Sequence, residues 1–394
     1  MQRLVVVGAS LAGLRAAQAA RAAGFDSELV VVGDEEHLPY TRPPLSKELL
    51  AGAQTPDDCA FPAKFEAEWR LGVAATGLDR ARRVVRLADG DEVPYDRLIV
   101  AAGCRARQWP GAEGVHTLRS LDDALALKAA LAERPRVAIV GGGFIGCEVA
   151  ATARKQGLEV TVVDIAPFPM VPLGPELGAR CADMHRAHGV DLRLGVGVQA
   201  LSATRIELAD GTRIDADLVV AALGAVPNSE WLGAAGGVAC DATLTTLVDA
   251  DVLGAGDVIS WPHPLADDEP VRVEHWTTAA EHGQLAGRNA LLPAAERAAH
   301  ELPPYFWSDQ YDVKIQAVGF PARADRLEIL ESEGERFVAA GARDGRLVGV
   351  VAFNAAKRLG WYRRQLPEQP SFEHIKDLVA ADEKALGATV AAAT

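Results

Sequence analysis

Two stretches of the chain repeat one order of hydrophobic and polar residues. Each begins with a short β-branched run, turns through glycines into an alanine-rich segment, and ends in a second β-branched run closed by an acidic residue. The first stretch covers residues 4–34 and the second covers residues 137–164. Units of strand, turn, helix and strand build parallel sheets with right-handed crossovers. The repetition therefore predicts two Rossmann-like nucleotide-binding domains, one for each of two cofactors.

Further apolar runs follow each unit and predict how the sheets close. Residues 95–103 and 217–224 are typical of buried strands that end on a glycine, and residues 251–258 form another apolar run with a Gly-Asp turn. We expect this last run to return to the first domain, which makes that domain discontinuous. The predicted boundaries are 1–108 with 225–300 for the first domain and 109–224 for the second.

From about residue 303 the pattern changes to alternating hydrophobic and polar positions. Runs at 327–330, 337–340 and 346–353 are separated by Glu-Gly and Asp-Gly turns, which is typical of an antiparallel meander. Residues 301–394 are therefore predicted to form a third, α+β domain with an antiparallel sheet. The expected fold class is α/β, with two nucleotide-binding domains followed by this smaller domain.

Composition and charge narrow the range of partners. Hydrophobic residues make up 49% and charged residues 24% of the chain, and no apolar stretch is long enough to predict a membrane span. A net charge of −14 argues against nucleic acid as a partner. The chain enters its first apolar run at Leu4 with no basic leader, so we expect a cytoplasmic protein.

Neither the cysteines nor the histidines form a recognisable disulfide or metal motif. The five cysteines, at positions 59, 104, 147, 181 and 240, contain no C-x-x-C pair, which fits a reducing compartment and isolated small apolar side chains. His185 and His188 lie three residues apart on a predicted helix, but no third ligand is evident and solvent-facing histidines are common. We therefore predict no metal site.

The second unit carries a complete dinucleotide motif. Gly141, Gly143 and Gly146 form G-x-G-x-x-G directly after one predicted strand and before an alanine-rich helix. These glycines permit a tight turn and bring a pyrophosphate close to the helix N-terminus, where unpaired N–H groups favour negative charge. Asp164 ends the next strand, where a carboxylate binds a ribose 2′-hydroxyl. Residues 165–175 contain no arginine for a 2′-phosphate, so NADH is expected over NADPH.

The first unit departs from this motif at one position. Gly8 and Gly13 match it, but Ser10 stands where the middle glycine is expected. Asp34 ends the following strand, with Glu35 as a neighbouring candidate for the ribose. These acidic residues restore the motif and predict a nucleotide in this unit too.

A longer motif follows the first unit. Residues 38–47, LPYTRPPLSK, resemble the oxygenase-coupled NADH-dependent ferredoxin reductases, the family that contains putidaredoxin reductase. Further matches to that family lie at residues 101–103, 141–148, 256–258, 273–276 and 306–311, so the resemblance covers nearly the whole chain. It implies that FAD occupies the first domain and NAD the second.

The resemblance also implies which residues contact the cofactors. Asp34 is expected to accept the adenosine ribose hydroxyls, Arg42 to face the pyrophosphate, and Asp257 to bind a ribityl or phosphate group. The expected FAD contacts are Gly8, Ser10, Ala12, Gly13, Asp34, Glu35, Arg42, Lys47, the backbone of Ala75 at the adenine, Arg119, Gly256, Asp257 and Trp276. The expected NAD contacts are Gly141, Gly143, Gly146, Glu148, Asp164 and Gly224.

Three residues are expected to be catalytic by the same resemblance. Lys47 is expected near the reactive edge of the flavin and paired with Glu148, while Trp307, with Trp276, flanks the ring system. The implied reaction takes hydride from NADH onto FAD. It then passes single electrons to an iron-sulfur ferredoxin, expected to be of the [2Fe-2S] type, which feeds an oxygenase such as a cytochrome P450.

Two other functions are open on the sequence alone. A disulfide or peroxide reductase would place a redox cysteine just after the first unit, yet residues 38–50 contain none and Cys59 lies beyond the motif. A non-enzymatic, NAD-responsive flavoprotein would carry targeting segments or basic surfaces for its partners, and neither is evident. The densest basic cluster near the C-terminus is either a docking patch for an acidic ferredoxin or a solvated charged face. Its members are Lys357, Arg358, Arg363 and Arg364.

Overall fold

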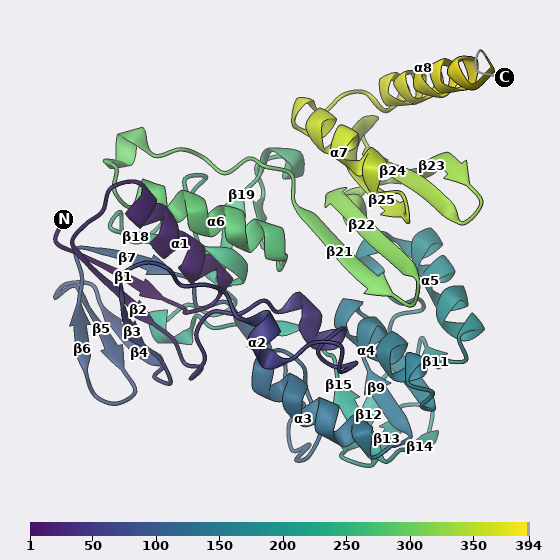
Figure 1. Ribbon diagram of the computed structural model, residues 1–394, viewed down its shortest axis with the longest axis horizontal. Helices are drawn as coiled ribbons and strands as arrows, with labels where there is room; N and C mark the ends of the chain where they lie inside the picture. Colours follow the sequence, from purple (N-terminus) through teal and green to yellow (C-terminus); the bar gives the residue numbers. More distant parts are fainter. Residues whose placement is uncertain (392–394) are drawn as a thin grey trace.

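The first sheet of the protein is parallel and contains five strands (Figure 1). The computed structural model describes residues 1–391, and the last three residues of the predicted third domain, 392–394, lie outside the described residues. The strand order is β18-β7-β1-β2-β3, and every neighbouring pair is parallel. The strands are β1 (Arg3–Val7), β2 (Glu28–Val32), β3 (Glu68–Arg70), β7 (Arg97–Val100) and β18 (Val252–Gly254). The run at 251–258 therefore returns to the first sheet, as its sequence predicts.

Two helices from distant parts of the sequence cover one face of this sheet. These are α1 (Leu11–Ala22) and α6 (Trp276–Asn289), which lie side by side above the strands in Figure 1. A Cβ atom added to Gly283 would lie 2.2 Å from the carbonyl oxygen of Ala12, so only glycine allows the two helices to approach this closely. Small sheets cover the opposite face. Their strands are β4 (Ala75–Asp79), β5 (Val84–Leu87), β6 (Glu92–Pro94), β17 (Val238–Ala239), β19 (Ile259–Pro262) and β20 (Pro270–Val271).

A second parallel sheet has the order β11-β10-β9-β15. Its strands are β9 (Val137–Val140), β10 (Val160–Asp164), β11 (Asp191–Leu194) and β15 (Leu218–Ala221). Helices α3 (Leu121–Ala132) and α4 (Phe144–Lys155) pack on one face. The antiparallel strands β12 (Val198–Ser202), β13 (Arg205–Leu208) and β14 (Arg213–Asp215) pack on the other. The two sheets are joined by β8 (Cys104–Ala106), which pairs antiparallel with β16 (Ala225–Pro227).

The C-terminal sheet is antiparallel, with the order β21-β22-β25-β24-β23. The three predicted runs lie in β23 (Arg326–Glu333), β24 (Arg336–Arg343) and β25 (Arg346–Phe353), and the predicted meander is confirmed. Two further strands complete it, β21 (Tyr305–Gln310) and β22 (Val313–Gly319). Successive side chains alternate between the faces. One face packs on α7 (Ala356–Gln365) and α8 (Phe372–Ala391), and the other on the loop after β10 and on α5 (Pro175–Ala187) of the second nucleotide unit.

The observed architecture matches the predicted fold class, with two Rossmann-like units and a C-terminal domain built on an antiparallel sheet. The remaining helix, α2 (Pro56–Cys59), and the 3-10 turn Pro43–Ser46 lie between β2 and β3. Among residues 1–391, no helix is both long and apolar enough to cross a bilayer.

Candidate active site

A cavity of about 880 Å³ lies where the two nucleotide units and the C-terminal sheet meet. Its wall includes the first glycine turn, most of residues 40–47 of the 38–47 motif, the start of α4, and Phe306 and Trp307 on β21. Predicted FAD contacts that line it include Ser10, Asp34 and Trp276. The topology thus brings together residues that range from position 8 to position 320. A cavity of this size and mixed lining suits an extended cofactor.

The first glycine turn has backbone geometry that only glycine accepts. Gly8 has a φ of +123°, and a Cβ atom there would lie 2.0 Å from the carbonyl oxygen of Ala101. A Cβ atom on Gly13 would lie 1.8 Å from the Gly8 carbonyl oxygen, so this glycine serves the packing of α1 against the turn. Ser10 faces the cavity and accepts a hydrogen bond of 3.2 Å from Arg42 Nε. The serine therefore replaces the middle glycine without closing the site.

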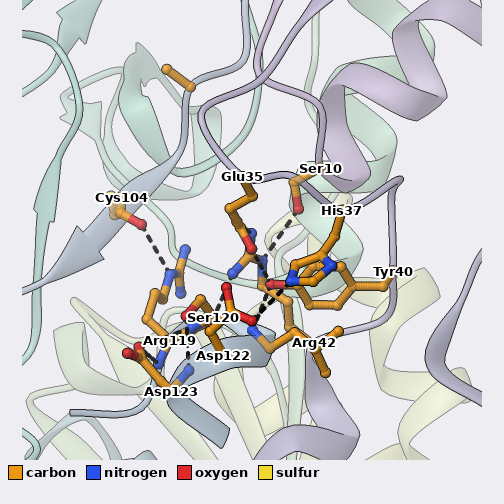
Figure 2. Close-up of polar contacts among 12 residues, drawn as sticks. Ser10, Glu35, His37, Tyr40, Arg42, Cys104, Arg119, Ser120, Asp122 and Asp123 are labelled. Atoms are coloured by element: carbon orange, nitrogen blue, oxygen red, sulfur yellow. Dashed lines mark hydrogen bonds and ion pairs between the residues drawn. The ribbon is translucent and has the colours of Figure 1, made fainter. Parts of the chain in front are cut away.

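Arg42 is held from several sides next to this turn (Figure 2). It forms an ion pair with Glu35 and donates to the carbonyl oxygen of Arg119 at 2.6 Å. Glu35 also accepts a hydrogen bond of 2.5 Å from the Tyr40 hydroxyl. Since the Glu35 carboxylate is occupied by these two partners, the exposed Asp34 beside it is the carboxylate left for a ribose.

A second ion pair lies farther along the cavity. Arg119 donates to the Asp257 carboxylate at 2.6 Å and to the carbonyl oxygen of Cys104 at 3.0 Å. Asp257 follows Gly256, whose φ of +78° turns the chain at the N-terminal side of a short 3-10 helix. His275 also lines the cavity, and its buried Nδ1 atom has no hydrogen-bond partner among residues 1–391. An unpaired polar atom at a cavity wall is what a site for a polar cofactor presents.

The predicted pair of Lys47 and Glu148 is confirmed. Lys47 Nζ lies 2.8 Å from Glu148 Oε2, and the side chains are 12% and 4% exposed. Ser46 Oγ donates to the same carboxylate oxygen at 2.5 Å, and Ser308 Oγ donates to Oε1 at 2.6 Å. These three donors come from distant parts of the chain, and their convergence fixes the orientation of the carboxylate and of the ammonium group.

The second glycine turn repeats the geometry of the first. Gly141 has a φ of +109°, and a Cβ atom on Gly146 would lie 1.9 Å from the Gly141 carbonyl oxygen. A Cβ atom on Gly143 would meet nothing within 4 Å, and this residue lines the cavity together with Gly224. The Asp164 carboxylate accepts hydrogen bonds from the backbone N–H groups of residues 142 and 166, at 2.5 Å and 2.7 Å. It therefore fixes the turn itself and does not line the cavity.

Ala75 is a predicted FAD contact that does not line the cavity. It sits on β4, partly buried against the core of the first domain. The other residues outside the lining, Gly13, Gly141, Gly146 and Asp164, shape the turns that the lining residues depend on.

Comparison with known proteins identifies the family of this chain. Residues 2–283 match the model of the pyridine nucleotide-disulphide oxidoreductase family, and residues 305–386 match a reductase C-terminal family. The chain belongs to the pyridine nucleotide-disulphide oxidoreductases. A similar member is the ferredoxin–NAD(+) reductase component of the anthranilate 1,2-dioxygenase system of Burkholderia cepacia, 36% identical over 91% of this chain and 93% of that protein. Putidaredoxin reductase CamA of Pseudomonas putida is 32% identical over 96% of this chain and 97% of that protein.

Two solved structures are similar to this protein in fold. The reductase in the covalent complex of putidaredoxin reductase with putidaredoxin superposes with a TM-score of 0.89 at 29% identity, over 98% of this chain and 99% of that chain. A water-forming NADH oxidase from Lactobacillus brevis has a TM-score of 0.86 at 17% identity, over 99% of this chain and 100% of that chain, and shares the fold.

This member of the family lacks the paired cysteines that its family name suggests. All five cysteines are free and buried. Cys104 lines the cavity, but burial and the Asp257 carboxylate raise the pKa of its thiol to about 12, which keeps it protonated. The cavity therefore holds no dithiol that could relay electrons.

The expectation of a solvent-facing His185 is wrong, and the structure divides the basic cluster into paired and exposed members. His185 is fully buried rather than solvent-facing, with Gln310 and Tyr311 as partners. No group of three or more potential metal ligands was found among residues 1–391. In the basic cluster, Arg358 pairs with Glu331 and Arg363 with Glu281, while Lys357 and Arg364 are exposed. The basic character of this surface is thus reduced by local carboxylates.

Proposed function

We propose that this oxidoreductase is a ferredoxin–NAD(+) reductase of an oxygenase system. The observation that carries the proposal is the buried pair of Lys47 and Glu148, which lies at the junction of all three parts of the chain and on the wall of the cavity that Trp307 shares. The relatives named above, matched over more than nine-tenths of the chain, carry the same activity in their names. When bound, FAD would accept a hydride and release electrons singly, which links a two-electron donor to a one-electron acceptor.

We propose that the cavity residues around the first glycine turn and around Asp257 hold FAD. Asp34 binds the adenosine ribose through its free carboxylate, and Arg42 faces the pyrophosphate with its guanidinium fixed by Glu35. Asp257, oriented by Arg119, binds the ribityl chain or a phosphate. The orientations of Arg42 and Asp257 are fixed by these neighbours, so little side-chain entropy is lost when they bind the cofactor.

At the reactive edge, Lys47 places a positive charge that stabilises electron-rich flavin, and Glu148 orients that ammonium group and helps to place the nicotinamide. Trp276 and Trp307 flank the ring system and exclude water. Electrons leave directly from the flavin edge towards the C-terminal domain, because the cavity offers no cysteine pair.

The domain assignment follows from these roles. Residues 1–108 and 225–300 hold FAD, residues 109–224 hold NAD, and residues 301–394 complete the site as the reductase domain.

NADH is the proposed donor rather than NADPH. Asp164 places a carboxylate beside the second glycine turn, and a 2′-phosphate there would meet repulsion without an arginine in residues 165–175. Steady-state kinetics with NADH and NADPH test this preference. Equal kcat/KM values would show that a basic residue from outside residues 165–175 reaches the 2′-phosphate.

The proposed electron acceptor is an iron-sulfur ferredoxin of the [2Fe-2S] type, which feeds an oxygenase such as a cytochrome P450 in the cytoplasm. Docking is assigned to the surface around the exposed Lys357 and Arg364 of α7. An acidic ferredoxin needs such a local patch because the chain as a whole carries a charge of −14.

Three measurements on the purified protein test the proposal. Heat release and chromatography should recover FAD, whereas FMN or no flavin would overturn the assignment. Stopped-flow mixing with NADH should bleach the flavin rapidly, and a [2Fe-2S] ferredoxin should reoxidise it. Turnover with disulfides or peroxides in place of ferredoxin would favour the reductase alternative. Binding of NAD without turnover of any acceptor would favour the non-enzymatic one.

A further inference from the structure

A continuous chain of buried hydrogen bonds runs from the Glu148 carboxylate away from the cavity. Ser308 Oγ bonds Glu148 Oε1 at 2.6 Å, and Gln310 Nε2 bonds Ser308 Oγ at 3.0 Å. Gln310 Oε1 lies 2.9 Å from His185 Nε2, and His185 Nδ1 lies 3.0 Å from the Tyr311 hydroxyl. Ser308, Gln310 and His185 are 0% exposed, so water does not compete for these bonds.

The direction of every bond in this chain follows from its inner end. Lys47 Nζ and Ser46 Oγ both donate to Glu148 Oε2, and Ser308 Oγ donates to Oε1 of the same carboxylate. Ser308 then has lone pairs for the Gln310 amide N–H, whose other proton points at the Met170 sulfur at 3.2 Å. A flipped amide would set its oxygen against these two acceptors, so the orientation of the Gln310 side chain is determined.

The same logic selects one tautomer of His185. Gln310 Oε1 accepts, so His185 Nε2 must carry the proton, and Nδ1 must accept from the Tyr311 hydroxyl. The imidazole must also be neutral for Nδ1 to accept. Burial lowers the pKa of His185 to about 4, which meets this condition near neutral pH. All donors in the chain thus point towards Glu148.

This row of hydrogen bonds is suited to positioning side chains and not to proton transport. Gln310 stands in its middle, and a side-chain amide passes a proton only through an unfavourable imidic acid form. Aligned hydrogen bonds instead polarise and orient one another, most strongly in a buried, low-dielectric setting. The elements joined are also separate: Glu148 and His185 belong to α4 and α5, whereas Ser308 and Gln310 belong to β21.

We propose that His185 is a positioning residue that acts through Gln310 and Ser308 to orient the Glu148 carboxylate, and through it the Lys47 ammonium group. The role in turnover rests on the proposed function. We call this row of hydrogen bonds from Tyr311 through His185, Gln310 and Ser308 to Glu148 the relay. It also fixes β21, the strand that carries Trp307, against the second nucleotide unit.

His185→Leu removes the outer half of the relay and is the first test. We expect NADH-driven flavin bleaching to slow about tenfold, the effect of losing one buried hydrogen bond. The midpoint potential of the bound flavin should fall by about 30 mV, the same tenfold factor for a two-electron couple. His185→Gln, which retains a donor for Gln310, should stay within about threefold of the unmodified protein.

His188→Leu is the matched control. His188 lies on the same helix, is exposed, and stacks on the Tyr311 ring at 3.6 Å without belonging to the relay. Its replacement should leave the bleaching rate and the potential unchanged. If His188→Leu reproduced the changes of His185→Leu, local packing around Tyr311 and not the relay would be responsible, and the proposal would be wrong.

A double-mutant cycle tests whether His185 acts through Ser308. Ser308→Ala alone removes the inner donor and should cost about as much as His185→Leu, and the double variant should cost little more than either. Additive effects would refute action through Ser308.

A structural readout separates the relay from the proposed function. ¹⁵N NMR of histidine-labelled holoprotein should show His185 as the Nε2–H tautomer, unchanged between pH 6 and 8. The signal is assigned by its loss in His185→Gln. An Nδ1–H tautomer or a titration in this range would overturn the relay even in an active enzyme. If NADH failed to reduce the unmodified protein, the proposed function would be rejected. The His185 tautomer seen by NMR would still show whether the relay exists.

Discussion

Replacing Glu148 by glutamine should weaken both the fold and the hydride step. Glu148 is 4% exposed and accepts three hydrogen bonds of 2.5–2.8 Å, from Lys47, Ser46 and Ser308. Glutamine keeps the size but removes the charge, and its NH₂ group must face one of these donors. Breaking a buried ion pair by truncating one partner costs about 3–5 kcal/mol. The remaining amide oxygen and the Pro43 carbonyl oxygen, 3.1 Å from Lys47 Nζ, still accept hydrogen bonds from the ammonium group. We therefore expect the free energy of unfolding to fall by about 2–3 kcal/mol in Glu148→Gln.

Urea unfolding of the holoprotein measures the stability loss, and stopped-flow reduction by NADH measures the rate. If the misoriented pair raises the activation free energy of hydride transfer by about 2 kcal/mol, the rate falls roughly 30-fold. Glu48→Gln is the control, because it removes the same charge from the exposed residue next to Lys47 and should change neither quantity. Unchanged stability together with an unchanged reduction rate in Glu148→Gln would show that the pair does not organise the site.

Three further predictions concern acid, docking and the cysteines. Burial lowers the pKa values of His185, His263 and His275 to about 4, below the unfolded value of 6.5, so the unfolded chain binds more protons between these values. The free energy of unfolding should thus be highest above pH 6.5 and should fall on acidification, by up to about 1.4 kcal/mol per pH unit for each histidine. A free energy of unfolding that stays constant from pH 6.5 to 5 in urea titrations would contradict this. Joint replacement of Lys357 and Arg364 by glutamate should lower ferredoxin turnover, most at low salt, and leave ferricyanide reduction unchanged, whereas equal loss with both acceptors would move the docking site elsewhere. Replacing all five cysteines by alanine or serine should preserve NADH-to-ferricyanide activity if the flavin content is retained, and its loss would point to a thiol relay.

Local patterns in the sequence determined the main architecture. The glycine turns at Gly8 and Gly141 are predictable because positive φ and close backbone approach leave a residue type no alternative. The β-branched runs and the alternation after residue 303 predict strands because side-chain periodicity reports local burial. The residues that the 38–47 motif contributes were also identified from the sequence, through their resemblance to a family.

Only the tertiary structure decided which charged and polar groups meet. Glu148 lies 101 residues from Lys47 and 160 from Ser308, and no periodicity links positions so far apart. The burial of His185 is equally non-local, since its partners belong to a hairpin of the C-terminal sheet that closes over α5. For the same reason the sequence shows Arg363 only as a member of a basic cluster, whereas the fold sets Glu281 against it at 2.8 Å. Composition and spacing specify each element, but the sign and strength of an interaction depend on the partner and the desolvation that packing supplies.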